Sequence, residues 1–152
     1  MKNKPVNTYL SYIATTPAKL WDALTNPDLT KEYFFGRRID SDWTVGSPVK
    51  YWLPDGTLDV SGKVLEYDPP RRLSYSWRAE ANEELRKLPE AIITFTADPL
   101  GDVVRLTMEE FHPSPIDPKH LDAGRRSWPV VFSSLKSLIE TGRSLPPFDM
   151  TK

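Results

Sequence analysis

The sequence contains no cysteine among its 152 residues. This absence excludes disulfides, thiolate nucleophiles and cysteine-ligated metal or iron–sulfur sites. An excess of charge of one sign is also missing, because 20 basic and 21 acidic side chains give a net charge of -1 at pH 7. Without a cationic field that attracts phosphate groups, nucleic acid is not expected as a partner.

Long apolar runs are absent as well. No stretch approaches the roughly 18 apolar residues of a membrane-spanning helix, and residues 1–5 lack the apolar core of a signal peptide. We therefore expect a cytoplasmic protein that has no membrane partner. Glycine is scarce, with 7 residues, whereas proline is frequent, with 15. Together they stay below the share that is typical of low-complexity chains, so the prolines are expected to delimit the elements of a folded domain.

The N-terminal quarter predicts one strand followed by two short helices. Residues 8–13 are rich in strand-forming side chains, and Thr16 followed by Pro17 is typical of a helix start. The helix should end near Asn26, because a residue that precedes a proline resists helical angles. Residues 27–34 then carry apolar side chains at helical spacing and predict the second helix.

Between residues 37 and 110 the apolar period changes to two, with turn sequences in between, which predicts six antiparallel strands. One face of such a sheet is expected to be buried and the other wet. Tyr75 and Trp77 should point inward and Arg105 outward. If Arg105 pointed inward instead, it could anchor an anionic ligand. Gly62 lies within a strand and indicates a bend, so a curved sheet is plausible.

The last third predicts one long helix that ends near Thr141. Residues 111–120 contain three prolines and are expected to form a loop. Pro129 suggests that the regular helix begins near Ser127 or is kinked there. Residues 79–89 are charged and predict a mobile excursion at one end of the sheet, where they could act as a rim or lid.

Several short segments, in this order, resemble one known family. They include Tyr12-Ile13-Ala14, Leu20-Trp21-Asp22-Ala23-Leu24-Thr25, Gly62-Lys63-Val64-Leu65-Glu66, Asp68-Pro69-Pro70-Arg71-Arg72-Leu73, Tyr75-Ser76-Trp77, and Trp128 with Leu135-Lys136. The sequence resembles the SRPBCC (START-related) superfamily, in the branch of the activator of 90-kDa heat shock protein ATPase homologues. The resemblance implies an α+β helix-grip (START-like) fold. In this fold a curved antiparallel sheet of about seven strands wraps around a long C-terminal helix, with two short helices after the first strand. We expect a single domain over residues 6–143 and a flexible tail over residues 144–152.

The resemblance also implies an internal, mostly apolar cavity between the sheet and the C-terminal helix. The candidate cavity residues are Trp43, Tyr51, Trp52, Tyr75, Trp77, Phe95, Trp128 and Phe132, with Tyr33, Phe34 and Phe35 at an entrance and His112 near the mouth. Trp77 and Trp128 are expected on opposing walls. The same aromatic side chains could also form an ordinary hydrophobic core.

The two histidines, His112 and His120, together with Glu109 and Glu110, form the one cluster that could suggest metal or acid–base chemistry. Their spacing matches no metal-ligand motif, and solvated or loop-packing roles are favoured over a functional His112. The family supplies no shared catalytic residue. No catalytic residue, metal or cofactor is therefore predicted.

Three functions follow from these observations. The first is binding of a small hydrophobic molecule in the cavity, by a monomer or homodimer. The second is an enzyme of cyclase, dehydratase or hydrolase type that acts on such a ligand, which a buried His112 would favour. The third is a co-chaperone-like or other protein-interaction module, which would show an exposed apolar patch. Direct ATPase activation is not expected, because the first strand begins near residue 8 and leaves no room for the extra N-terminal domain of the eukaryotic activators.

Overall fold

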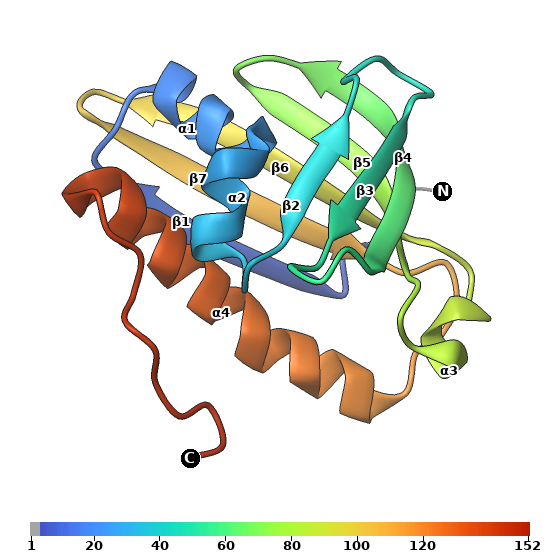
Figure 1. Ribbon diagram of the computed structural model, residues 1–152. Coiled ribbons are helices and arrows are strands. Elements are labelled where there is room, and N and C mark those ends of the chain that lie inside the picture. Colours follow the sequence, from blue (N-terminus) through green and yellow to red (C-terminus); the bar gives the residue numbers. More distant parts are fainter. Residues whose placement is uncertain (1–3) are drawn as a thin grey trace.

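A computed structural model describes residues 4–152, and it shows a curved sheet with helices packed on one face (Figure 1). The strands are β1 (Asn7–Ile13), β2 (Arg38–Ser41), β3 (Pro48–Trp52), β4 (Leu58–Asp68), β5 (Arg72–Ala79), β6 (Ala91–Leu100) and β7 (Val103–Phe111). The helices are α1 (Pro17–Thr25), α2 (Pro27–Tyr33), α3 (Glu83–Arg86) and α4 (Pro118–Thr141). All neighbouring strands are antiparallel, in the order β1-β7-β6-β5-β4-β3-β2. The predicted helix-grip fold is confirmed.

The two short helices begin as the sequence predicts. The Thr16 hydroxyl accepts a hydrogen bond from the Lys19 amide at 3.3 Å, and the Asn26 side chain accepts one from the Asp28 amide at 3.0 Å. A proline occupies the first turn of each helix, where a backbone N–H would have no hydrogen-bond acceptor within the helix, so its absence costs nothing. Asn26 both ends α1 and begins α2, so the two helices follow each other directly on the concave face of the sheet.

The bend of the sheet depends on Gly62 of β4. A Cβ atom at this position would lie 1.8 Å from the Ser76 carbonyl oxygen, so only glycine allows β4 and β5 to approach so closely. The pairing register then shifts between Val64 and Glu66, which marks a bulge. Ser76 is buried where β4 covers it, and Ser74 is buried as well. The expectation that this face of β5 is wet was therefore wrong at both positions. At Ser76 the bend brings β4 close, with the Lys63 amide donating to the Ser76 hydroxyl, and the Ser74 hydroxyl shares a hydrogen bond with Thr94 of β6.

Helix α4 begins earlier than the sequence predicts. It starts at Pro118, with the Asp117 side chain accepting a hydrogen bond from the Lys119 amide at 3.0 Å, and it continues through Pro129. The prediction of a loop as far as residue 120 was wrong, and of the two alternatives at Pro129 a regular helix that begins only near Ser127 is excluded. A proline at the first helical position is well tolerated, and Pro129 faces solvent while Trp128 on the opposite face is buried. The loop is limited to residues 112–117.

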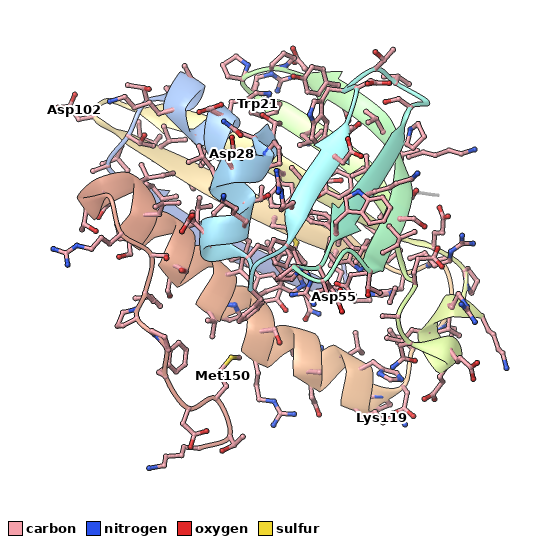
Figure 2. The ribbon with its side chains drawn as sticks, in the orientation of Figure 1. Trp21, Asp28, Asp55, Asp102, Lys119 and Met150 are labelled. Atoms are coloured by element: carbon pink, nitrogen blue, oxygen red, sulfur yellow. The ribbon has the colours of Figure 1, made fainter. Side chains whose placement is uncertain are left out.

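The chain after α4 runs away from the sheet along the helix (Figure 1). The Leu145 amide donates to the Ser134 hydroxyl at 3.2 Å, and Met150 points back toward α4 (Figure 2). Among the helices formed by residues 4–152, none is long and apolar enough to cross a membrane.

Candidate ligand pocket

One pocket of about 170 Å³ lies at the end of the sheet near α3, and we name it the end pocket. It is lined by Trp77, Arg78, Ala79, Leu85, Leu88, Pro89, Ala91, Ile93, Glu110, His112, Ile116, His120, Gly124 and Trp128. These residues come from β5, β6 and β7, from the α3 segment, and from the first half of α4. Figure 2 shows Lys119, at the start of α4, on the side of the molecule where α3 lies.

The apolar side of the end pocket is built around two indole rings. Trp77 comes from the sheet and Trp128 from α4, and their ring centroids are 5.6 Å apart at an angle of 59°. The Phe34 ring packs against both, with centroid distances of 6.3 Å to Trp77 and 5.3 Å to Trp128. This cluster fixes the orientation of both indoles, because aromatic rings in such tilted contacts attract one another.

The polar side of the pocket contains Glu110 and His112, which follow the inward face at the end of β7. The Glu110 carboxylate and the His112 Nε2 atom are 2.5 Å apart, and each side chain is only 12% exposed. Asn7 of β1 donates to the other Glu110 oxygen at 3.2 Å and accepts a hydrogen bond from Arg125 of α4 at 2.8 Å. The carboxylate is therefore held between the sheet and α4.

Tyr9 of β1 lies near Glu110, and the charge of this carboxylate affects the pKa of Tyr9. Burial, followed by the negative charge of Glu110, raises the pKa of Tyr9, whereas the nearby Arg125 guanidinium opposes the shift. The Tyr9 hydroxyl is buried and finds no hydrogen-bond partner among residues 4–152. Glu110 thus lies at a place where water is largely excluded.

His120 reaches the end pocket from the first turn of α4. Its Nε2 atom is buried and accepts or donates no hydrogen bond within the described part of the chain. The nearest acidic group, the Glu84 carboxylate on α3, lies 3.6 Å away, which is beyond hydrogen-bond range. Buried polar atoms of proteins are nearly always paired, so this nitrogen is an exception that needs a reason.

Gly124 faces the pocket from the interior of α4. A Cβ atom here would meet only the Trp128 ring, at 3.8 Å, which is ordinary contact. Glycine weakens a helix interior, and no turn or close approach requires it at this position. Its effect is to leave the end pocket open. The sequence signal was a glycine four residues before Trp128 in a helical pattern, and our sequence analysis missed it.

The structure places other predicted residues in a different region, under the middle of α4. Tyr33, Phe95 and Phe132 surround a gap of only about 10 Å³. Tyr75 is 1% exposed, and its hydroxyl shares a hydrogen bond of 2.6 Å with that of Tyr51. These side chains fill the space in which the sequence analysis expected a cavity.

The remaining candidates lie away from the end pocket. Trp43 stacks on Tyr67, with centroids 5.9 Å apart. Trp52 lies on the outer side of β3, where its Nε1 atom donates to Asp40 at 3.4 Å and Lys50 approaches its ring. Phe35, directly after α2, is 44% exposed.

The excursion over residues 79–89 covers the end pocket. It contains the short helix α3, which Asn82 caps by accepting a hydrogen bond from the Leu85 amide at 3.0 Å. Leu85 and Leu88 turn inward and line the pocket. Within residues 4–152 no group of three or more acidic or histidine side chains has an arrangement that could hold a metal ion.

Several solved structures share this architecture. The protein MLL2253 from Mesorhizobium loti is 26% identical, with a TM-score of 0.73 over 88% of this chain and 97% of that protein. The Aha1 dimer from Colwellia psychrerythraea is 20% identical, with a TM-score of 0.71 over 95% of this chain and 100% of that one. CalU16 from Micromonospora echinospora is 21% identical, with a TM-score of 0.67 over 89% of this chain and 76% of that one. At such identities the last two show a common fold alone.

A search of curated proteins finds no match. A family model described as "Activator of Hsp90 ATPase homolog 1-like protein" matches residues 14–140. This span runs from the end of β1 almost to the end of α4, so it includes most of the sheet and all the helices. The chain therefore belongs to the family of activator of Hsp90 ATPase homolog 1-like proteins, and the resemblance seen in its sequence is confirmed.

Proposed function

We propose that this protein binds a small aromatic or apolar molecule in the end pocket. The observation that carries the proposal is Gly124, which leaves space open beside the two indole rings, although most other residues would make this helix position more stable. The volume of about 170 Å³ is close to that of an engineered protein cavity of about 150 Å³ that admits benzene. A ligand with one ring fits this space.

The proposed place of binding differs from the one that the sequence analysis expected. The space under the middle of α4 is filled by side chains, whereas space stays open under its first half, where Gly124 has no side chain to fill it. The residues that we propose to contact the ligand are therefore Trp77, Trp128 and His112 from the original set, joined by Ile93 and Leu85.

Toluene is a suitable probe for this proposal. Native mass spectrometry of the freshly purified protein would first show whether a compound is already bound, and isothermal titration calorimetry would then measure toluene affinity. We expect the wild type to bind toluene and Gly124→Leu to lose binding, since a leucine side chain would occupy the pocket.

Ala123→Leu provides the matched control, because Ala123 is exposed on the same helix turn. This variant should bind toluene as the wild type does. The proposal is wrong if neither toluene nor a panel of one-ring and two-ring compounds binds, or if Gly124→Leu binds as tightly as the wild type.

Catalysis on such a ligand stays a hypothesis. Glu110 and His112 are the acid–base groups that a reactive ligand would meet, and His112 is mostly buried. Conversion of any ligand identified by mass spectrometry would be measured by incubating it with the wild type and with His112→Ala. The cytoplasmic location likewise stays a prediction.

A co-chaperone-like interaction is a second candidate function. The family name supports it, and so does an apolar surface beside α2 that is formed by Phe35, Leu145, Phe148 and Met150, which are between 37% and 54% exposed. The test is a calorimetric titration of an Hsp90 protein with this protein. Binding that Phe35→Ser abolishes supports the interaction, and an absence of binding counts against it.

The state of assembly is part of the same proposal. The relative from Colwellia psychrerythraea is described as a dimer, and β1 forms a free edge of the sheet here, with Leu10 and Tyr12 more than half exposed. We propose a homodimer as the form to test. Light scattering coupled to gel filtration distinguishes it from a monomer.

A further inference from the structure

Two polar groups of the end pocket have hydrogen-bonding capacity that the described residues do not fill. The Glu110 carboxylate contacts Asn7 through one oxygen and His112 through the other, although a carboxylate offers about four acceptor positions. The His120 Nε2 atom is buried and has no hydrogen bond at all within residues 4–152. Because buried polar groups rarely stay unpaired, both call for a partner inside the pocket.

The opposite side of the same pocket offers only apolar contacts. Trp77 and Trp128 supply ring faces, and Leu85 and Ile93 supply aliphatic groups. A molecule that satisfies both sides needs an apolar body and one polar end. With a volume of about 170 Å³, the body is limited to a single ring.

The charges around the pocket restrict what the polar end can be. A carboxylate on the ligand would meet the Glu110 carboxylate, with the Glu84 carboxylate only 3.6 Å from His120. The cation that lines the pocket, Arg78, is already paired with Glu80 at 2.7 Å. An anionic ligand would therefore be repelled.

A hydroxyl group meets all of these conditions. It is uncharged, it can donate its one proton to Glu110, and its oxygen can accept a hydrogen bond from His120 when the Nε2 atom carries the imidazole proton. We propose that the end pocket selects single-ring compounds that carry a hydroxyl group, with Glu110 and His120 as the partners of that hydroxyl. This inference rests on the proposed function and names its ligand class.

Three probes of similar size test the proposal: 4-methylphenol, toluene and 4-methylbenzoate. Calorimetric titrations would be run on the wild type, Glu110→Gln and His120→Phe. A hydrogen bond to a charged or buried group changes an equilibrium constant by about tenfold. We therefore expect each variant to bind 4-methylphenol about tenfold more weakly than the wild type does, with a much smaller change in toluene binding. The wild type should not bind 4-methylbenzoate.

Glu109→Gln is the matched control, because Glu109 is the neighbouring residue of β7 and points to the opposite face of the sheet. Glu109→Gln should leave the ratio of the dissociation constants for toluene and 4-methylphenol unchanged. Circular dichroism would check that each variant is folded. If His120→Phe does not fold, the comparison of Glu110→Gln with Glu109→Gln decides whether the pocket recognises the hydroxyl group.

The outcomes separate the two levels of the argument. If neither toluene nor 4-methylphenol binds the wild type, the proposed function itself fails. If both bind and the variants change both affinities equally, ligand binding stands and hydroxyl recognition is overturned, with water as the partner of the polar groups. Tight binding of 4-methylbenzoate would also overturn the proposal, since it would show that the pocket accepts an anion.

Discussion

The interior between the sheet and α4 has two regions of opposite character. Under the middle of the helix, Phe95, Phe132 and Leu135 are buried and border a gap of only about 10 Å³. Under the first half, Gly124 leaves about 170 Å³ open, and Glu110 introduces a charge. Both regions are rich in aromatic rings, so aromatic content alone does not distinguish a packed core from a binding site. The size of the side chains on the helix makes the difference.

The largest effect should come from removing volume in the packed region. Leu135→Ala deletes a side chain that is 0% exposed, and such substitutions cost about 2 to 5 kcal/mol of the free energy of unfolding. Leu88→Ala, on the edge of the end pocket, should cost under about 1 kcal/mol, because this side chain is only half-buried and already borders open space. Urea unfolding of both variants checks the contrast, and equal losses would contradict it.

High pH should weaken the packed region next. Burial raises the pKa of Tyr33, Tyr51 and Tyr75 above the usual value near 10. The unfolded chain therefore releases these protons first, and the stability they contribute is fully present below about pH 10 and is lost as pH rises further. At pH 11 the loss is roughly 1 kcal/mol for each tyrosine.

Urea unfolding between pH 8 and pH 11, with phenolate absorbance recorded in parallel, measures this effect. We expect the buried tyrosines to ionise only as the protein unfolds. Ionisation of all tyrosines near pH 10 in a protein that stays folded would show that the packed region admits water.

The hydroxyl pair in the packed region gives a third, smaller effect. Tyr75→Phe leaves the Tyr51 hydroxyl buried without its partner at 2.6 Å, which should cost about 1 to 3 kcal/mol. The double variant Tyr51→Phe/Tyr75→Phe removes both polar groups and should be more stable than the sum of the two single changes implies. Thermal or urea unfolding of the four proteins completes the cycle, and strict additivity would mean that the two hydroxyls do not interact.

The smallest effect is expected at the end pocket and has the opposite sign. Gly124→Ala should stabilise the protein by about 0.5 to 1 kcal/mol, since alanine favours a helix interior. The added methyl would lie 3.8 Å from the Trp128 ring, so toluene binding should persist. A loss of stability in unfolding experiments would show that Gly124 serves packing and not the open space.

Local rules predicted much of the fold from particular residues. Thr16 and Asn26 begin the short helices because their side chains accept hydrogen bonds from amide groups of the first turn. The alternation along β5 correctly predicted that Tyr75 and Trp77 point inward. The prediction failed at Pro118, which was placed in a loop, and at Pro129 the alternative of a helix start near Ser127 failed. Their positions in the first turn and on the exposed side, respectively, make these two prolines tolerable.

The candidate site was predictable only in part. Trp77 and Trp128 were expected on opposing walls of a cavity. They come from the sheet and from α4 and both line the end pocket, but their rings are in contact, with centroids 5.6 Å apart, whereas Trp43 and Trp52 lie elsewhere. Side-chain type indicates what a residue can contact, but whether a pocket stays open depends on which side chains meet there in the fold. Gly124 lacks a side chain that would occupy the end pocket, and this becomes evident only once the residues around it are known.

By itself the sequence determined the order of the strands and of α1, α2 and α4, the starts of the two short helices, the inward-facing side chains of β5 and the family, because these depend on local periodicity and on residues near one another in the chain. The tertiary structure decided which aromatic side chains fill the core and which surround open space. It also brought Asn7, Glu110, His112 and His120 to one place, although Asn7 and Glu110 are 103 positions apart. Such a meeting depends on the pairing of β1 with β7 and on the packing of α4, and no local pattern encodes either.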